Sequence, residues 1–476
     1  MRFPLRQPDA RDYSSSSRSS SGARLRSGRS QRGTAARAGW LAAVFFALLL
    51  AIGGGGSPAP FAELALELLT VIIAVLWLSG FAGDAVQRVP RTAWAVAALV
   101  IAVPLVQLIP LPPLIWQALP GRALAADALA LVGEQSSWRA WSLAPQRTLA
   151  SLLSLGPPLL LLVMTGALPV RERIMLIGAL LAMAGATLIL GAVQLSGGAA
   201  DAVLNGFQAN RNSTADVLLV AIIAVPLLAE RKALRRQQKT ASLALLAIAG
   251  TGMLVLAAGT VFTGSRVGIA LLPVAALASL WLLRGRFALS PKKLAIALVT
   301  AAASVAAFFI LVRTNAELAR IFKRFSLFSE ELRPQLWRDG IYVVRQHFPF
   351  GVGMGNFVPA LLADERLEVV RPALPNRAHN DYIELAAEAG AFGMAALSEV
   401  SLLLTRAALR TRRMVQGESS DLLLFAAAAL AILALHSLVD YPFRSMSLAS
   451  LGAVCGGLLL TPRSADRQAR HGSPTV

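Results

Sequence analysis

Two arginines and one histidine stand in short polar segments between apolar runs, where their side chains could act on a charged substrate. Arg211 lies in NGFQANRNSTAD, Arg266 lies in FTGSRVG, and His379 follows Arg377 in PNRAHNDYIEL. A guanidinium binds phosphate oxygens through parallel hydrogen bonds and keeps its charge at any physiological pH. A neutral imidazole can take a proton near neutral pH. These residue types are suited to phosphate binding and to general-base catalysis.

Each of these residues also has a simpler interpretation. Arg266 could extend its side chain to lipid headgroups, as arginines near the end of a membrane helix do. Arg211 stands between Asn210 and Asn212, where a solvated arginine is ordinary. His379 could be a solvated loop histidine. An arginine kept at membrane depth nevertheless indicates a functional site, so the topology of the chain matters for the choice.

The composition predicts an all-α polytopic membrane protein. Of the 476 residues, 56% are hydrophobic and 15% are charged, whereas soluble domains have roughly 45 to 50% and about 25%. A helix that crosses a bilayer needs about 20 mostly apolar residues. We predict about 12 transmembrane helices, at residues 39–56, 64–82, 92–111, 149–168, 173–195, 215–229, 241–261, 267–283, 294–312, 384–404, 421–438 and 446–461.

The positions of the basic residues predict which side of the membrane each turn faces. Lysine and arginine in the short loops are concentrated on the side that carries the N-terminus, and the positive-inside rule places that side in the cytoplasm. An even number of crossings puts both termini there. Arg211, Arg266 and His379 then share the outward face.

The chain divides into one membrane domain and two tails. Residues 1–37 are rich in arginine and serine and poor in large apolar side chains, so we expect a disordered cytoplasmic tail. The alternative is a signal peptide with residues 40–52 as its apolar core, but the basic region is far too long for one. Residues 38–461 form the predicted transmembrane domain, and residues 462–476 form a second cytoplasmic tail.

Two outward segments are too long to be simple connections. Residues 112–148 mix prolines, tryptophans and polar residues, and residues 313–383 form a large loop between the ninth and tenth predicted helices. Loops of this length are functional or disordered. The aromatic residues of the second loop and its glycine-rich turn PFGVGMGNF favour a folded structure on the outward face.

The start of the tenth predicted helix positions His379. Asp381, followed three residues later by Glu384, resembles a capping box and predicts a helix that begins at Asp381. His379 would then lie just above the membrane surface. Glu388 lies one turn after Glu384 on the same face, where it can support this helix end.

The sequence argues against nucleic acid, disulfides and a metal site. The net charge of +19 would suggest nucleic acid for a soluble protein, but membrane topology and basic tails explain the excess here. Cys455 is the single cysteine, so an intramolecular disulfide is impossible. The outward segments contain no D-x-D or H-E-x-x-H pattern. We expect His436, in HSLVDYPF, to be a packed polar group bonded to Asp440 or Tyr441.

Several motifs, taken in order, resemble the O-antigen ligase and polymerase superfamily. They are GFQANRNSTA, GSRVG, RPQLW from Arg333 on, PFGVGMGNF, AHNDYIELAAEAGAFG and HSLVDYPF, and they extend from about residue 200 to 445. The resemblance implies a GT-C type membrane glycosyltransferase of the bacterial inner membrane, with its active site facing the periplasm. Its donor would be an undecaprenyl-diphosphate-linked glycan, and no metal or other cofactor would be needed.

The resemblance also implies roles for individual residues. His379 matches the histidine proposed as base, and Arg211 and Arg266 match the arginines thought to hold the donor diphosphate. Supporting positions are Asn210, Asn212, Arg333, Arg377, Asn380 and Glu388. The sequence departs from the common pattern after Asn212, where Ser213 and Thr214 replace a frequent histidine and aromatic pair. Donor contacts on that side are therefore not carried over.

The acceptor is not encoded in these motifs. A ligase transfers the glycan to the lipid A core, an O-antigen or exopolysaccharide polymerase transfers it to another lipid-linked repeat, and a protein O-glycosyl ligase transfers it to a protein side chain. The basic character of the long loop favours an anionic acceptor such as lipid A core. A lipid-glycan transporter is the alternative from another class, but transporters have two related halves with broken helices at the midplane, whereas the polar groups here gather at one face.

Overall fold

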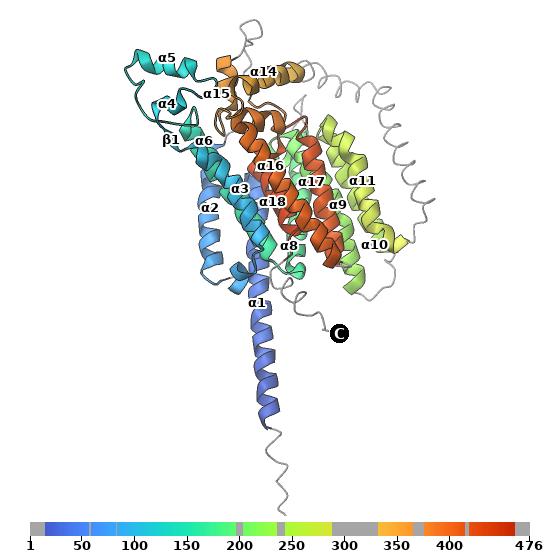
Figure 1. Ribbon diagram of the computed structural model, residues 1–476. Helices are drawn as coiled ribbons and strands as arrows, with labels where there is room; N and C mark the ends of the chain where they lie inside the picture. Colours follow the sequence, from blue (N-terminus) through green and yellow to red (C-terminus); the bar gives the residue numbers. More distant parts are fainter. Residues whose placement is uncertain are drawn as a thin grey trace, which may run out of the picture.

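The computed structural model describes residues 15–56, 59–81, 83–196, 203–235, 243–287, 332–364, 376–414 and 418–461. Its longer helices are α1 (Ser15–Ile52), α2 (Pro60–Leu78), α3 (Arg91–Gln107), α6 (Pro145–Ser154), α7 (Gly156–Ala167), α8 (Val170–Ser196), α9 (Arg211–Arg235), α10 (Leu243–Phe262), α11 (Arg266–Phe287), α16 (Asp381–Met414), α17 (Glu418–His436) and α18 (Met446–Leu458). These helices pack into one bundle (Figure 1).

The bundle has the character of a membrane protein. Within the described residues, eight helical segments are long and apolar enough to cross a membrane, and α3, α10 and α18 contain shorter apolar helices. Each predicted apolar run except 294–312 falls on one of these helices, with 149–168 shared by α6 and α7. The run at 294–312 lies outside the described residues. The all-α membrane class is therefore confirmed.

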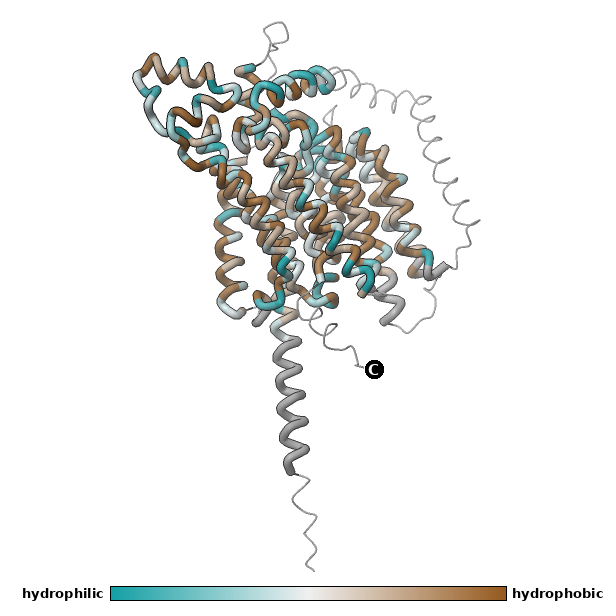
Figure 2. Tube along the Cα trace, in the orientation of Figure 1, coloured by the Kyte–Doolittle hydropathy of each residue, from teal (hydrophilic) through white to brown (hydrophobic). Residues whose placement is uncertain are grey.

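The outward segments form a cap on one end of the bundle. The cap consists of α4 (Pro113–Trp116), α5 (Ala123–Leu131), α14 (Leu332–His347), α15 (Phe357–Asp364) and an antiparallel pair of two-residue strands, β1 (Pro110–Leu111) and β2 (Arg139–Ala140). It lies at the top of Figure 1. Figure 2 shows hydrophobic residues along the bundle, with hydrophilic residues gathered at the cap and at the opposite end.

Helix α1 begins earlier than the sequence predicted. It starts at Ser15, so residues 15–37 are helical where we expected a disordered tail, and residues 1–14 lie outside the described part. The segment has no proline between Ser15 and Ile52, so nothing in the backbone forces the apolar helix to end at its upstream side.

Helix α9 is the centre of the bundle. It packs against α8, α10, α11 and α17, and most of its apolar side chains, such as Val217 and Leu218, are fully buried. The N-terminal end of α9 faces the cap. From there α9 runs away from the cap, α10 runs back toward it, and α11 starts at the cap end again. Arg211, the first residue of α9, is thereby placed near the middle of the cap end of the bundle.

The glycine-rich turn at 349–357 joins the cap to α16. Gly390 interrupts α16 with a φ of 55°, and a Cβ there would lie 2.1 Å from the carbonyl oxygen of Pro349, so only glycine fits. The N–H of Ala391 donates to that same carbonyl at 2.9 Å. Gln107 of α3 completes the junction, because it donates to the Glu388 carbonyl and accepts from the N–H of Met354.

Candidate functional site

His379 is paired with a carboxylate at the cap end of the bundle. Its Nδ1 lies 3.0 Å from Oδ1 of Asp440, and its ring makes an edge contact with Tyr441 at 4.9 Å between centroids. The side chain of His379 is 28% exposed, whereas that of Asp440 is 5% exposed. The imidazole is thus anchored on its buried side and reachable on the other.

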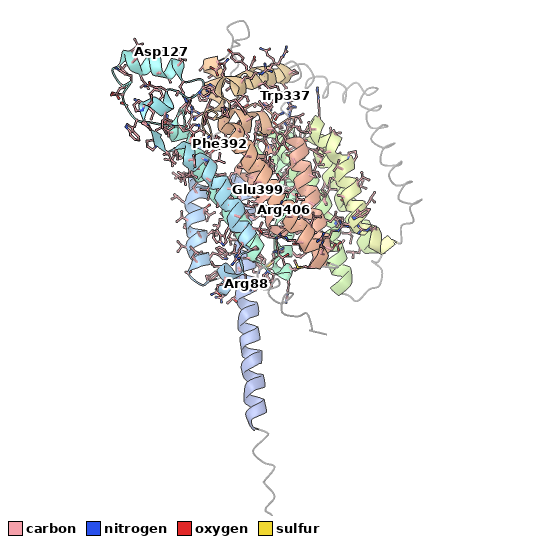
Figure 3. All side chains as sticks on the ribbon, in the orientation of Figure 1. Arg88, Asp127, Trp337, Phe392, Glu399 and Arg406 are labelled. Atoms are coloured by element: carbon pink, nitrogen blue, oxygen red, sulfur yellow. The ribbon has the colours of Figure 1, made fainter. Side chains whose placement is uncertain are left out.

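The backbone at His379 adopts a conformation that side chains rarely accept. Among the described residues, the non-glycine positions with positive φ are Ala209, at 51°, and His379, at 48°. The strain at His379 is maintained by its neighbours, since Trp337 of α14 donates its indole N–H to the His379 carbonyl at 3.2 Å. Figure 3 labels Trp337 on α14 in the cap. Strained residues of this kind are concentrated at functional sites.

Asn380 caps the helix that follows His379. Its Oδ1 accepts from the N–H groups of Tyr382 and Ile383 at 3.0 Å each, and its amide donates to the Leu438 carbonyl at 2.7 Å. Helix α16 begins at Asp381 as predicted, but the capping box of Asp381 with Glu384 is wrong. An asparagine side chain before the helix reaches these N–H groups first. Figure 3 shows Phe392, Glu399 and Arg406 following α16 away from the cap.

Arg377 and Glu384 hold the segment before His379. Arg377 Nη1 lies 2.9 Å from Glu384 Oε1, and the N–H of Ala378 donates to Glu384 Oε2 at 3.0 Å. Glu384 is fully buried, so its charge needs these partners. The predicted supporting residue Arg377 therefore fixes the loop that carries His379.

Arg444 joins three acidic residues of α16. Its Nη1 lies 2.5 Å from Glu388 Oε2, and its Nε lies 3.5 Å from carboxylate oxygens of Asp381 and Glu384. Burial alone would lower the pKa of Arg444, but the carboxylates raise it above its ordinary value. Glu388 also accepts from the N–H of Phe357 at 3.2 Å. Glu388 thus supports the site by holding α16, η4 (Pro442–Arg444) and the cap together.

Arg211 and Arg266 each begin a helix that points its N-terminus at the cap. Asn210 caps α9, since its Oδ1 accepts from the N–H of Asn212 at 2.9 Å. Ser265 caps α11, since its hydroxyl accepts from the N–H of Gly268 at 3.1 Å. A helix N-terminus carries partial positive charge and attracts anions. Both arginines therefore add a full charge to an end that is already positive.

These two helix ends lie against each other. A Cβ on Gly268 would lie 2.6 Å from the Cβ of Ala215, so the glycine permits α9 and α11 to approach closely. Arg211 interacts electrostatically with Arg333, Asp440 and Arg266. The structure therefore brings the predicted arginines together beside the partner of His379.

Arg333 and Asn212 stand at the same end. Arg333 lies in the first turn of α14 and is half-buried. It interacts electrostatically with both Asp440 and Arg211. Asn212 gives its backbone N–H to the cap of α9. Arg333 is thus a third cation at the site. The hydrogen bond of Asn212, by contrast, belongs to the N-terminal cap of α9.

Tyr441 links the arginine side of the site to the histidine side. Its hydroxyl oxygen lies 3.4 Å from the amide nitrogens of Asn210 and Asn376, and its ring contacts His379. Burial, together with the charge of Asp440, raises the pKa of the Tyr441 phenol. Tyr441 is therefore a neutral bridge, and Asn210 supports both its own helix and this contact.

The sequence alone did not predict Asp440 as the hydrogen-bond partner of His379. Burial would raise the pKa of its carboxyl, but the hydrogen bond and the charge of His379 hold it below its ordinary value. Asp440 follows α17, 61 residues after His379. The sequence signal that could have identified Asp440 is the motif HSLVDYPF, which carries this aspartate at the predicted outward end of a helix.

His436 has a different main partner from those we expected. Its Nδ1 lies 2.6 Å from Oδ1 of Asp216 in α9, while its Nε2 lies 3.9 Å from Oδ2 of Asp440. Both His436 and Asp216 are buried. The prediction of a packed polar group is consistent with this burial, and Asp440 is one of the partners as predicted, but Asp216, which the sequence did not indicate, lies closer.

A second histidine pair lies in the cap. His347 Nε2 is 3.1 Å from Oδ2 of Asp364. The structure shows no cluster of three or more histidine, cysteine or acidic residues with the geometry of a metal site among the residues it describes. The positive groups available to an anionic ligand in this part of the chain are therefore arginines and helix ends.

Residues 251–398 match the family model described as O-antigen ligase. This match supports an assignment to the O-antigen ligase family. The resemblance drawn from the motifs is confirmed over these residues, and the match supports a membrane enzyme of the O-antigen ligase or polymerase type.

The O-antigen ligase region contains only part of the site. It includes Arg266, Arg333 and His379, whereas Arg211 and Asp440 lie on either side of it. No curated protein matches the chain. Arg211 and Asp440 are therefore brought close to residues of the matched region by the packing of the helices.

Proposed function

We propose that this chain is a metal-independent, inverting glycosyltransferase of the GT-C type. It transfers a glycan from undecaprenyl diphosphate to an acceptor hydroxyl at the periplasmic face of the bacterial inner membrane, with lipid A core as the acceptor. The observation that carries the proposal is the His379–Asp440 pair, which stands next to Arg211, Arg266 and Arg333 at the outward end of the bundle.

His379 acts as the general base. Asp440 accepts a hydrogen bond from Nδ1 of the imidazole, which leaves Nε2 with its lone pair available for a proton. The acceptor oxygen attacks the anomeric carbon as its proton passes to Nε2, and the bond from that carbon to the diphosphate oxygen breaks. A single displacement of this kind inverts the configuration at the anomeric carbon.

The arginines stabilise the leaving diphosphate. Breaking the glycosyl bond leaves negative charge on the lipid carrier, and fixed positive groups lower the energy of that step. Arg211 and Arg266 begin α9 and α11, so each combines a guanidinium with a helix N-terminus. Arg333 adds positive charge from α14.

The membrane setting suits a lipid-linked donor. The site lies at the end of an apolar bundle, which a carrier lipid can reach by lateral diffusion in the bilayer. A soluble nucleotide sugar would need a supply outside the cytoplasm, where nucleotides are not produced. The site at the outward face therefore favours undecaprenyl diphosphate as the carrier.

Deletion in the native host tests the proposed acceptor. Loss of every O-chain form on lipopolysaccharide gels supports a ligase, and a core with a single repeat supports a polymerase instead. An unchanged pattern contradicts both and indicates an exopolysaccharide or protein acceptor. Complementation should succeed with the Asp364→Asn variant, which alters the histidine pair in the cap, and should fail with His379→Gln.

A further inference from the structure

Asp216 and His436 form a buried, hydrogen-bonded pair that the proposed reaction does not use. Their side chains are 1% and 0% exposed, and His436 Nδ1 lies 2.6 Å from Asp216 Oδ1. Asp216 lies in the central helix α9, and His436 lies in α17, which packs against α9. Charged groups are expensive to bury even in pairs, and an apolar pair of similar size would fill the same space at no such cost.

The other nitrogen of His436 faces the candidate site. Nε2 lies 3.9 Å from Oδ2 of Asp440 and makes no hydrogen bond within the described part of the chain. Asp440 uses its Oδ1 for His379. Four side chains therefore stand in a row, from the buried Asp216 through His436 and Asp440 to the exposed face of His379.

A carboxylate beside each ring nitrogen favours protons on both nitrogens of His436. Each nitrogen faces a carboxylate oxygen, and an unprotonated nitrogen would direct a lone pair at negative charge. Arg333 of α14 also acts electrostatically on His436. From α16, Asp381 bonds to the hydroxyl of Ser437, the neighbouring residue.

We propose that His436, held by Asp216 as a buried imidazolium, is a positioning residue that acts through Asp440 on His379. The inference rests on the proposed function, in which His379 is the base. Asp440 stabilises the protonated His379 that each transfer produces, and a positive charge at His436 weakens that hold. The proton taken from the acceptor stays on His379 Nε2 until it leaves to water, and no proton moves along the row.

The expected consequence is a change in the protonation of His379 when the charge at His436 is removed. With Asp440 acting on His379 alone, His379 would release its proton at a higher pH. We expect the uncharged double variant Asp216→Asn with His436→Gln to move the protonation midpoint of His379 upward by about half to one pH unit. The acidic limb of the pH–rate profile should move by the same amount.

Histidine-selective ¹⁵N NMR of the full-length protein can measure this directly, because the chain has four histidines. Single His→Gln variants assign the signals. In the wild type we expect His436 to have both nitrogens protonated at neutral pH, and neutral His379 to carry its proton on Nδ1. The matched control is His347→Gln with Asp364→Asn, which removes the histidine pair of the cap and should leave the His379 midpoint in place.

A folded double variant with an unchanged His379 midpoint would overturn the proposal, and so would a neutral His436 in the wild type. The second result needs no variant, so the test does not depend on the folding of the double variant. The NMR readout also needs no glycosyl transfer. A wild-type protein that shows the expected His436 signal but transfers no glycan would contradict the proposed function and leave the four-residue arrangement standing.

Discussion

Replacing Asp440 with asparagine tests the role of the carboxylate beside His379. Asparagine has nearly the same shape, so the main change is the loss of negative charge next to the imidazolium that forms during transfer. Two unit charges about 4 Å apart interact by about 4 kcal/mol at an effective dielectric constant of 20. Because His379 is 28% exposed, solvent screens part of this energy, and we take about 2 kcal/mol as the lower bound.

These energies convert directly into rates. A loss of about 2 to 4 kcal/mol from the transition state lowers kcat by about 30-fold to about 1,000-fold. The donor KM should change little, since Asp440 faces the histidine and the three arginines remain. The assay is transfer by purified protein in lipid nanodiscs, with a lipid-linked glycan as donor and an excess of acceptor.

Asp364→Asn is the matched control for this variant. Asp364 lies 3.1 Å from a histidine nitrogen, as Asp440 does from His379, but its pair lies in the cap and has no role in the proposed chemistry. We expect its kcat to stay within about twofold of the wild type. A folded Asp440→Asn variant with the same kcat as this control would refute the role of Asp440.

Four further predictions follow from the same contacts. Arg266→Lys should raise the donor KM by about tenfold to a hundredfold, because an ammonium cannot reproduce a bidentate phosphate contact. The control Arg284→Lys, at the opposite end of α11, should leave the donor KM unchanged. Equal donor KM values for the two variants would contradict this prediction. Chelation by EDTA should leave the transfer rate unchanged, and a loss restored by a divalent cation would remove the arginine-based mechanism. Gly390→Ala should lower the Tm, because the backbone conformation alone costs about 1 to 3 kcal/mol for a side chain and its Cβ meets the Pro349 carbonyl; an unchanged Tm would mean that the kink is not required. The folded-state pKa of Asp440 lies below its ordinary value, so its contribution to stability is complete above about pH 4 and is lost as pH falls further. Below that pH, the Tm of the wild type should therefore drop more steeply than the Tm of Asp440→Asn. Parallel Tm curves for the two proteins would exclude this contribution.

The sequence predicted the membrane class and the principal polar residues because these are local properties. Apolar runs of sufficient length predict spanning helices without any knowledge of how they pack. Arg211, Arg266 and His379 were identified in short polar segments, and the alternation of helices predicted a shared face. The structure brings Arg211 and Arg266 close together through the contact of Gly268 with Ala215.

The partners of the histidines could not be predicted in the same way. Asp440 and Asp216 reach their histidines across 61 and 220 residues of sequence, and such contacts depend on which helices are neighbours. The capping prediction failed for a related reason. Asp381 has the right spacing for a capping box, but it bonds to Ser437 and to the N–H of Phe443, both supplied by distant chain.

His379 is proposed to take the proton from the acceptor as the glycan leaves its lipid diphosphate. The most direct test is a single turnover of purified protein with a glycan-loaded undecaprenyl diphosphate, comparing the wild type with His379→Ala. We predict that the wild type releases one undecaprenyl diphosphate for each glycan transferred and inverts the anomeric carbon, and that His379→Ala binds the donor but transfers at least about 100-fold more slowly. Turnover of His379→Ala at the wild-type rate would contradict the account.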